Sequence, residues 1–147
     1  MEFKRILCCV DFSANAEKAF YAALSQAEKF NVQVHLLHVL PPVVNPLLTD
    51  IDLAVPDDSR KSLVQQLEEQ MVSEYGRKIK KNIDYRIAVR DGHISSEILN
   101  YIIDEKIDLV ILGAYGLSGV ELVLFGSVAK RIAHKAPCSV MIIRETN

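Results

Sequence analysis

Short apolar runs alternate with longer amphipathic segments along the chain. The apolar runs, which we expect to form strands, cover residues 4–10, 32–40, 83–89, 108–112 and 138–143. Strands that alternate with helices are typical of β-α-β units, whose crossovers are right-handed. The sequence therefore predicts an α/β fold, a single-domain doubly wound (Rossmann-like) five-stranded parallel sheet with helices on both faces. Ligands of such sheets bind outside the carboxyl ends of the strands, where the strand order reverses.

The segments between these runs have the apolar spacing of helices. We expect one helix capped by Ser13 and ending at Phe30, one starting at Ser59 with apolar residues at every fourth position to Ile79, one capped by Ser95 or Ser96, and one from Ser127 to Lys135. From Pro41 to Asp58 no period is visible, and this stretch holds four of the five prolines. A long loop of this kind is usually functional or mobile.

Length and charge exclude several classes of protein. A chain of 147 residues that is 50% hydrophobic fits one domain, residues 1–147. The net charge of −2 provides no basic field for nucleic acid. No apolar run approaches the roughly 18 residues of a membrane span, and no signal peptide precedes Asp11, so we expect a cytoplasmic protein without a membrane partner. Cys8, Cys9 and Cys138 are then expected to be buried reduced thiols.

A glycine-rich segment follows the fourth predicted strand. Gly113 and Gly116 lie directly after that strand, and Gly126-Ser127 opens the last predicted helix. Backbone N–H groups at such turns and at a helix start point outward, and the helix end adds roughly half a positive charge. The pattern predicts an anion site, and we interpret it as a nucleotide site. It would share one crevice with Asp11 if the first and fourth strands are neighbours.

Other readings of the glycines fit less well. A P-loop is excluded because no Gly-Lys-Ser/Thr occurs in the chain. The spacing of Gly113, Gly116 and Gly119 fits a dinucleotide fingerprint poorly, and that fingerprint follows the first strand of a sheet. A structural alternative stays open, in which the glycines only relieve a tight connection between strand and helix. No spacing of the four histidines suits a metal, since His35 and His38 must point to opposite faces of a strand.

The glycine spacing, together with four other segments, resembles the ATP-binding branch of the universal stress protein family. The resemblance rests on Gly113-x-x-Gly116, nine further residues and Gly126-Ser127, with VDFSANAEKAF, LLHVL, DGHISSEIL and GSVAKRIAHKAPCSVMIIR in the family's order. It implies ATP, or ADP or AMP, as ligand, with Mg or Mn as a possible companion and no metal site from the protein alone. It also implies a homodimer paired through the last strand, from Cys138 to Ile143, and a role in stress tolerance.

The same resemblance implies which residues bind the nucleotide. The phosphates and the ribose would lie close to the backbone of Gly113 and Gly116, and the phosphate oxygens would accept hydrogen bonds from Gly126, Ser127 and Val128. The nucleoside end would meet Asp11, and the adenine edge would contact the backbone of Val39. The base would lie between Cys9, Val10 and Leu112. Tyr115, between the glycines, belongs to the same predicted site.

The phosphate segment departs from the family at several positions. Leu117 and Glu121 stand where relatives often carry basic or polar residues, and Ala114-Tyr115 replaces a common Ser-His pair. No cation lies between Gly113 and Lys130, so we expect reduced affinity for the γ-phosphate and effective competition by AMP or ADP.

Three functions remain open from the sequence. We favour a nucleotide sensor or switch, with no catalytic residue assigned. The first alternative is a slow ATPase or phosphotransfer enzyme, although the motif shows no Walker lysine or arginine finger. The second is a receiver-like phosphoacceptor domain with Asp91 as acceptor, although Phe12 stands where receivers need a second acid.

Overall fold

The computed structural model describes residues 2–42, 57–115 and 126–144. The elements in chain order are β1 (Arg5–Cys9), α1 (Ala14–Phe30), β2 (Gln33–Leu40), α2 (Asp57–Glu74), the 3-10 turn η1 (Gly76–Lys78), β3 (Tyr85–Asp91), α3 (Ile94–Asp104), β4 (Leu109–Gly113), α4 (Ser127–Lys135) and β5 (Ser139–Ile143). All five strands are parallel, in the order β3-β2-β1-β4-β5. The predicted fold class is confirmed.

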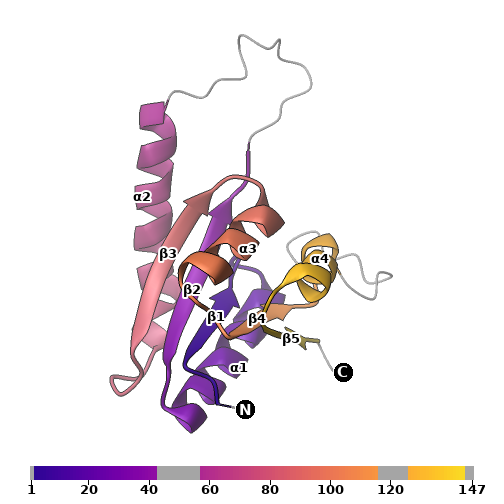
Figure 1. Ribbon diagram of the computed structural model, residues 1–147. Coiled ribbons are helices and arrows are strands. Elements are labelled where there is room, and N and C mark those ends of the chain that lie inside the picture. Colours follow the sequence, from indigo (N-terminus) through magenta and orange to yellow (C-terminus); the bar gives the residue numbers. More distant parts are fainter. Residues whose placement is uncertain (1, 43–56, 116–125, 145–147) are drawn as a thin grey trace.

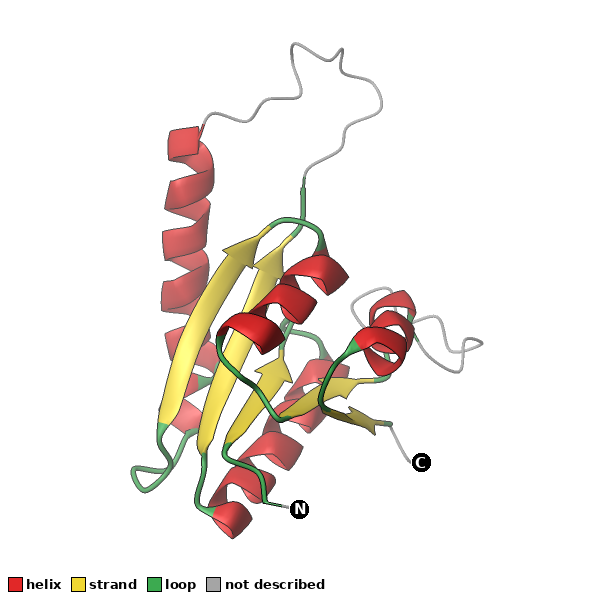
Figure 2. Ribbon diagram, in the orientation of Figure 1, coloured by secondary structure: helices red, strands yellow, loops and turns green. Residues whose placement is uncertain are grey.

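Helices cover both faces of the sheet (Figures 1 and 2). On one face, α1 and α2 close a core that includes Ile6, Cys8, Phe20 and Met71, and on the other, α3 and α4 close a second core around Leu7. Successive residues of a strand point to opposite faces. The continuous apolar runs of β1 and β4 therefore reflect burial on both sides of the sheet.

The strand order reverses between β1 and β4. The chain moves outward from β1 through β2 to β3, then crosses back to β4 and continues to β5. Residues Ile6, Leu7 and Cys8 of β1 pair with Leu109, Val110 and Ile111 of β4. The carboxyl ends of these two neighbouring strands therefore border one crevice, as the sequence predicted for the ends at Asp11 and Gly113.

Helix boundaries agree with the predictions except at α2 and α3. Ser13 caps α1 as expected, since its Oγ accepts the N–H of Ala16 at 3.1 Å. The predicted cap of α3 was wrong: His93, whose Nδ1 accepts the N–H of Ser96 at 3.5 Å, precedes a helix that already contains Ser95 and Ser96. A histidine ring can accept a helix N–H much as a serine hydroxyl does, and propensity favoured serine.

The second helix begins before Ser59 and ends before Ile79, contrary to the prediction. It covers Asp57–Glu74 and is followed by Gly76, where the 3-10 turn begins. The third strand also differs, since Ile83 lies in a turn and the strand extends to Asp91. Ile83 is nonetheless buried at 7% exposure, so its apolar character reflects packing rather than strand pairing.

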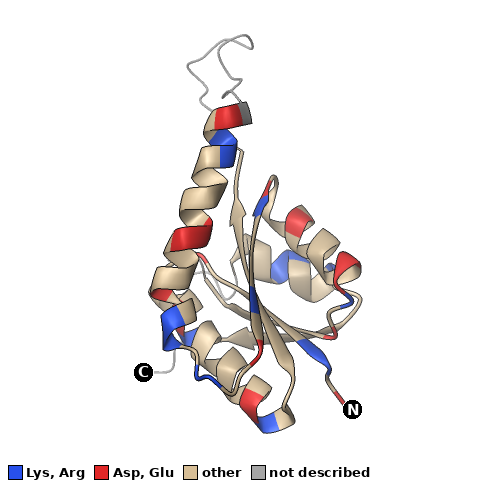
Figure 3. Cartoon of the chain, turned by 90° about the vertical axis from the view of Figure 1, so that its left-hand side faces the viewer, with Lys and Arg blue, Asp and Glu red and all other residues tan. Residues whose placement is uncertain are grey.

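Charged residues of both signs are distributed along α2 (Figure 3). Among the described residues, no helix is long and apolar enough to cross a membrane.

Candidate functional site

A cavity of about 380 Å³ lies at the carboxyl ends of β1, β2 and β4. Its volume is within the range of small-molecule sites, about 300–1,000 Å³. The predicted site residues that line it are Cys9, Val10, Asp11, Val39, Leu112, Gly113, Tyr115, Gly126, Ser127 and Val128. Of the other predicted positions, Gly116 lies outside the described residues, as do Leu117, Gly119 and Glu121 and most of the loop from Pro41 to Asp58.

The cavity has further lining residues that the sequence did not indicate. They are Ala16, Leu37, His38, Pro41, Ile94, Ile98, Ala114 and Ala129. Ile94 and Ile98 come from α3 and are four residues apart, so they share one face of that helix. The helix itself was predicted from its periodicity. The end of α3 that borders the site is determined by the strand order, and the apolar periodicity of the sequence gives no information on that order.

The inner wall of the cavity is apolar. Val10 and Leu112 are buried at 4% and 3% exposure, and Cys9 lies beside them at the end of β1. Burial raises the pKa of the Cys9 thiol to about 12, with smaller contributions from Cys138 and Asp11. The thiol is therefore protonated at neutral pH and contributes a polarizable apolar surface. Cys8, Cys9 and Cys138 are all free, Cys8 being buried and the other two half-buried.

Asp11 places a carboxylate just beyond the carboxyl end of β1. Its Oδ1 accepts the N–H of Ser13 at 3.0 Å, which turns the chain from β1 into α1. The residue is half-buried and lines the cavity. One oxygen is thus fixed by the backbone, and the carboxylate as a whole is an acceptor for hydroxyl or N–H groups of a ligand.

The opposite side of the cavity is the start of α4. The first turn of this helix has no acidic residue, and its last turn carries His134 and Lys135. The first ladder bond runs from the N–H of Lys130 to the carbonyl of Gly126 at 3.0 Å, so the N–H groups of the three preceding residues have no partner within the helix. This end of the helix suits an anion.

One predicted anion donor is already occupied. The N–H of Gly126 donates to the carbonyl of Ala114 at 2.6 Å, which joins the start of α4 to the chain after β4. A Cβ at Gly126 would lie 3.1 Å from the same carbonyl oxygen. Packing against Ala114 therefore explains why position 126 is a glycine. The amides of Ser127 and Val128 are the better candidates for contact with a ligand.

The glycine at position 113 is also explained by packing within the fold, without a ligand. A Cβ built on it would lie 3.0 Å from the carbonyl oxygen of Asn15 and 3.1 Å from its carbonyl carbon, in the first turn of α1. Only a hydrogen fits between β4 and this helix. Gly113 therefore permits a close approach of β4 to the backbone of α1, which is a packing role different from the tight strand-to-helix connection considered from the sequence.

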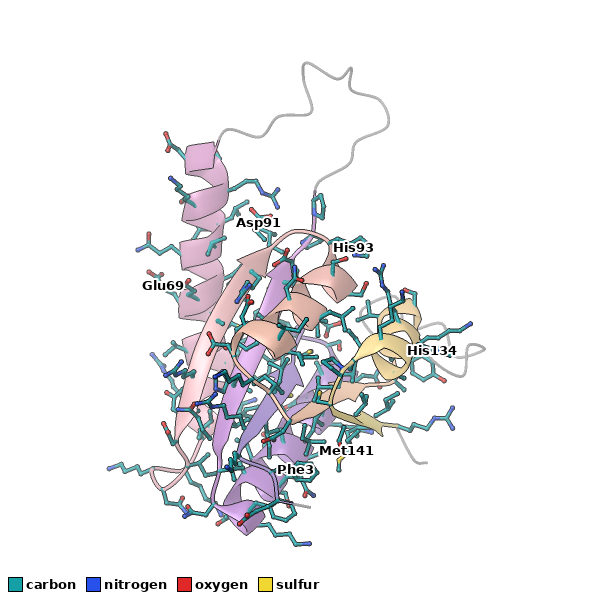
Figure 4. All side chains as sticks on the ribbon, in the orientation of Figure 1. Phe3, Glu69, Asp91, His93, His134 and Met141 are labelled. Carbon is teal, nitrogen blue, oxygen red and sulfur yellow. The ribbon has the colours of Figure 1, made fainter. Side chains whose placement is uncertain are left out.

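A second hollow of about 350 Å³ adjoins the first. It shares Pro41, Ile94, Ser127 and Val128 with the first cavity and adds His93 and Arg131. Figure 4 shows His93 at the beginning of α3, at the end of the sheet where the cavity lies. The guanidinium of Arg131, in α4, and the imidazole of His93, the residue before α3, thus border the site.

The two histidines of β2 lie on opposite faces of the strand, as predicted. His35 packs against Tyr101 of α3, and its Nδ1 lies 2.7 Å from the tyrosine hydroxyl. His38 points to the other face, where its ring contacts that of Phe12. No group of three potential metal ligands among His, Cys, Asp and Glu occurs within residues 2–42, 57–115 and 126–144.

Asp91, the acceptor in the receiver alternative, is paired with a cation. Arg60 of α2 donates to both carboxylate oxygens of Asp91 and to the carbonyl of Pro41. The Arg60 guanidinium lowers the pKa of Asp91. Asp91 ends β3 at the edge of the sheet, whereas receivers use the strand order 2-1-3-4-5, in which strand three neighbours strand one. The observed order does not provide that arrangement.

Comparisons with known proteins find members of one family. The model of the universal stress protein family matches residues 2–144. A universal stress protein of Methanocaldococcus jannaschii is 26% identical, with 97% of this chain and 83% of the relative covered. The universal stress protein YxiE of Bacillus subtilis is also 26% identical, with 97% and 99% covered.

Solved structures show the same fold. The universal stress protein UspA from Lactobacillus plantarum superposes with a TM-score of 0.71 at 24% identity, over 98% of this chain and 99% of that one. A universal stress protein in complex with cAMP gives 0.63 at 16% identity, over 99% and 100%. One from Archaeoglobus fulgidus in complex with dAMP gives 0.59 at 20% identity, over 97% and 99%. With the family model covering nearly the whole chain, this protein belongs to the universal stress protein family.

Proposed function

We propose that this chain binds an adenine nucleotide in the cavity between β1 and β4 and acts in the cytoplasm as a sensor or switch in stress tolerance. The observation that carries the proposal is that the cavity has an apolar wall and two chemically different sides. Its inner wall is apolar, Asp11 lies at one side, and the start of α4 lies at the other. Two relatives of the same fold hold cAMP and dAMP, which supports an adenine nucleotide as ligand.

In the proposed arrangement, base and phosphates occupy different parts of the cavity. The base lies between Cys9, Val10 and Leu112 and meets the backbone of Val39. Asp11 accepts from the nucleoside, because a carboxylate beside the phosphates would repel them. The phosphates lie against the amides of Ser127 and Val128, which have no partner within α4. The hydroxyl of Ser127 is a further donor.

Whether the bound form is ATP, ADP or AMP depends on what balances the phosphate charge. The described residues supply the guanidinium of Arg131 at the adjoining hollow. No cluster of three acidic, histidine or cysteine ligands occurs in the described part of the chain, so a divalent Mg or Mn ion would be held largely by the phosphates themselves. We propose that ATP binds with such an ion and that AMP competes without one.

We also propose that the chain forms a homodimer through its last strand. β5 is an edge of the five-stranded sheet, and all five of its residues are half-buried. An exposed edge presents unpaired N–H and C=O groups to another strand.

Release and titration of nucleotide test the proposal together. Denaturing the purified protein should release an adenine nucleotide, identified by chromatography. In calorimetry with ATP, Asp11→Ala should weaken binding about tenfold and Ser127→Ala about fivefold, given the usual value of hydrogen bonds to charged groups. Ser73→Ala, an exposed serine of α2, is the matched control and should bind normally.

The same titrations separate the finer alternatives. EDTA should weaken ATP binding and leave AMP binding unchanged, and tight ATP binding in EDTA would contradict the role of the metal. A turnover above about 1 s⁻¹, the low end of typical enzymes, would favour the ATPase alternative. A wild-type chain that binds no adenine nucleotide would overturn the proposal.

A further inference from the structure

The backbone beside Asp11 has an unusual conformation. Phe12 has φ of +65°, in the left-handed region, where the chain leaves β1 for α1. A residue with a Cβ pays roughly 1–2 kcal/mol for this conformation, and it persists only where surrounding contacts hold it. Phe12 is the residue directly after the carboxylate that lines the cavity.

One hydrogen bond from a distant part of the chain holds this turn. The N–H of Phe12 donates to the hydroxyl of Tyr75 at 3.1 Å. The two rings also stack, with centroids 5.6 Å apart and an interplanar angle of 26°. Tyr75 thus contacts both the backbone and the side chain of Phe12, although 63 residues separate them.

Tyr75 is itself fixed from the side of α2. It is 3% exposed, and its ring lies 5.1 Å from that of the fully buried Phe20. Its N–H donates to the carbonyl of Met71 at 2.9 Å, which continues the hydrogen-bond ladder of α2. The hydroxyl is therefore presented to Phe12 by a rigid part of the core.

The other side of the turn is also held. The ring of Phe12 lies 4.9 Å from that of His38, and Nδ1 of His38 donates to the carbonyl of Val10 at 2.8 Å. The residue between Val10 and Phe12 is Asp11, whose Oδ1 accepts from Ser13. The backbone on both sides of Asp11 is thus fixed by side chains from β2 and from the end of α2.

We infer that Tyr75 is a positioning residue for ligand binding: its hydroxyl holds the left-handed turn at Phe12 and so aims the Asp11 carboxylate into the cavity. This inference rests on the proposed function, since Asp11 is the group that meets the nucleoside. Tyr75 does not itself line the cavity. Its effect on the ligand therefore passes through Asp11.

A double-mutant cycle with calorimetric titration of AMP tests the inference. Tyr75→Phe removes the hydroxyl and keeps the ring, and it should weaken AMP binding about fivefold, the effect of one lost hydrogen bond. In the Asp11→Ala background the same change should have no further effect, because the group that Tyr75 positions is gone. A general loss of structure would instead add to the Asp11→Ala effect.

Tyr101→Phe is the matched control. Tyr101 is also a buried tyrosine, 4% exposed, and its hydroxyl also makes a hydrogen bond, to His35 on the other face of the sheet. This variant should bind AMP as the wild type does. Amide exchange of Phe12, measured by NMR without ligand, should be faster in Tyr75→Phe and unchanged in Tyr101→Phe.

The outcomes separate this inference from the proposed function. A wild type that binds no nucleotide would overturn both. If the wild type binds AMP, then unchanged affinity in Tyr75→Phe, equal weakening with and without Asp11, or unchanged exchange of the Phe12 amide would each overturn the positioning role alone.

Discussion

At the scale of single residues, the two glycines of the site that the structure describes serve packing. Gly113 faces the backbone of Asn15, and Gly126 faces the carbonyl of Ala114. Their sequence spacing is a family signature, but the contact that excludes a side chain at each is internal to the fold. The spacing therefore reflects packing around the site, and we propose that the amides of Ser127 and Val128 are the groups that contact a ligand.

The packing role of Gly113 predicts a loss of stability on Gly113→Ala. The added Cβ would lie 3.0 Å from a backbone oxygen, which cannot move without shifting α1. We expect the free energy of unfolding, measured with urea, to fall by about 1–3 kcal/mol, as for other overpacked sites. Gly76→Ala is the control, since its Cβ would meet the far end of the Tyr85 side chain at 3.2 Å and should cost less. Equal stability of Gly113→Ala and wild type would contradict the packing role.

At the scale of elements, a buried histidine joins β2 to α3. Nε2 of Gln33 donates to Asp84 at 2.8 Å, which directs Oε1 of Gln33 to Nε2 of His35 at 2.9 Å. His35 must then donate from Nε2, and Nδ1 accepts from the hydroxyl of Tyr101. Both ring nitrogens are satisfied by the neutral imidazole.

The environment of His35 predicts a loss of stability in mild acid. Burial first, and then Arg86, lower the pKa of His35 from its ordinary 6.5, with Arg5 acting in the same direction and Glu105 and Asp84 opposing them. Below pH 6.5 the unfolded chain binds a proton that the folded chain does not. The free energy of unfolding should therefore decrease as the pH is lowered below 6.5, by at most about 1.4 kcal/mol per pH unit, until the pKa of the folded state is reached.

Urea unfolding of variants between pH 7.5 and 5.5 checks this dependence. His35→Asn should be less stable throughout but should show a flatter dependence on pH. His134→Asn, which changes an exposed histidine of α4, should keep the wild-type slope. A wild type whose stability is constant across this interval would show the prediction to be wrong.

At the scale of the whole molecule, β5 leaves one edge of the sheet open among the described strands. The N–H of Ser139 and the carbonyl of Ile143 both bond toward β4. Because these roles alternate along a strand, the backbone groups of Val140 and Ile142 point to the outer edge. These are the groups that would pair with a second copy.

The proposed dimer predicts that a proline on this edge yields monomers. Val140→Pro removes an outward N–H and no bond to β4, and proline is accepted at such edge positions. Sedimentation at micromolar concentration should show a dimeric wild type, a dimeric Val140→Ala and a monomeric Val140→Pro, with the folded state of each checked by circular dichroism. A monomeric wild type would refute the dimer.

The sequence by itself was sufficient for most of the elements, and ten of the predicted site residues line one cavity. Periodicity and capping depend on neighbours a few residues away, so the helix capped by Ser13 and the five strands were predictable, with errors at His93 and Ile83 where a histidine cap and a buried turn imitate other patterns. The resemblance to the family implied which residues after β1 and before α4 form the site, and the rule that parallel strands place their ends at one edge of the sheet predicted only that Asp11 and Gly113 border one crevice.

Only the tertiary structure decided which backbone groups of the cavity already have hydrogen-bond partners and which contacts fix the segments around the cavity. The bond from Gly126 to Ala114, the fit of Gly113 against Asn15 and the bond from Phe12 to Tyr75 join segments that are distant in sequence or belong to different elements. Such contacts depend on strand order and on how helices pack on each face, which no local pattern encodes. For the same reason Ile94 and Ile98 were predicted as helical residues but not as a wall of the cavity.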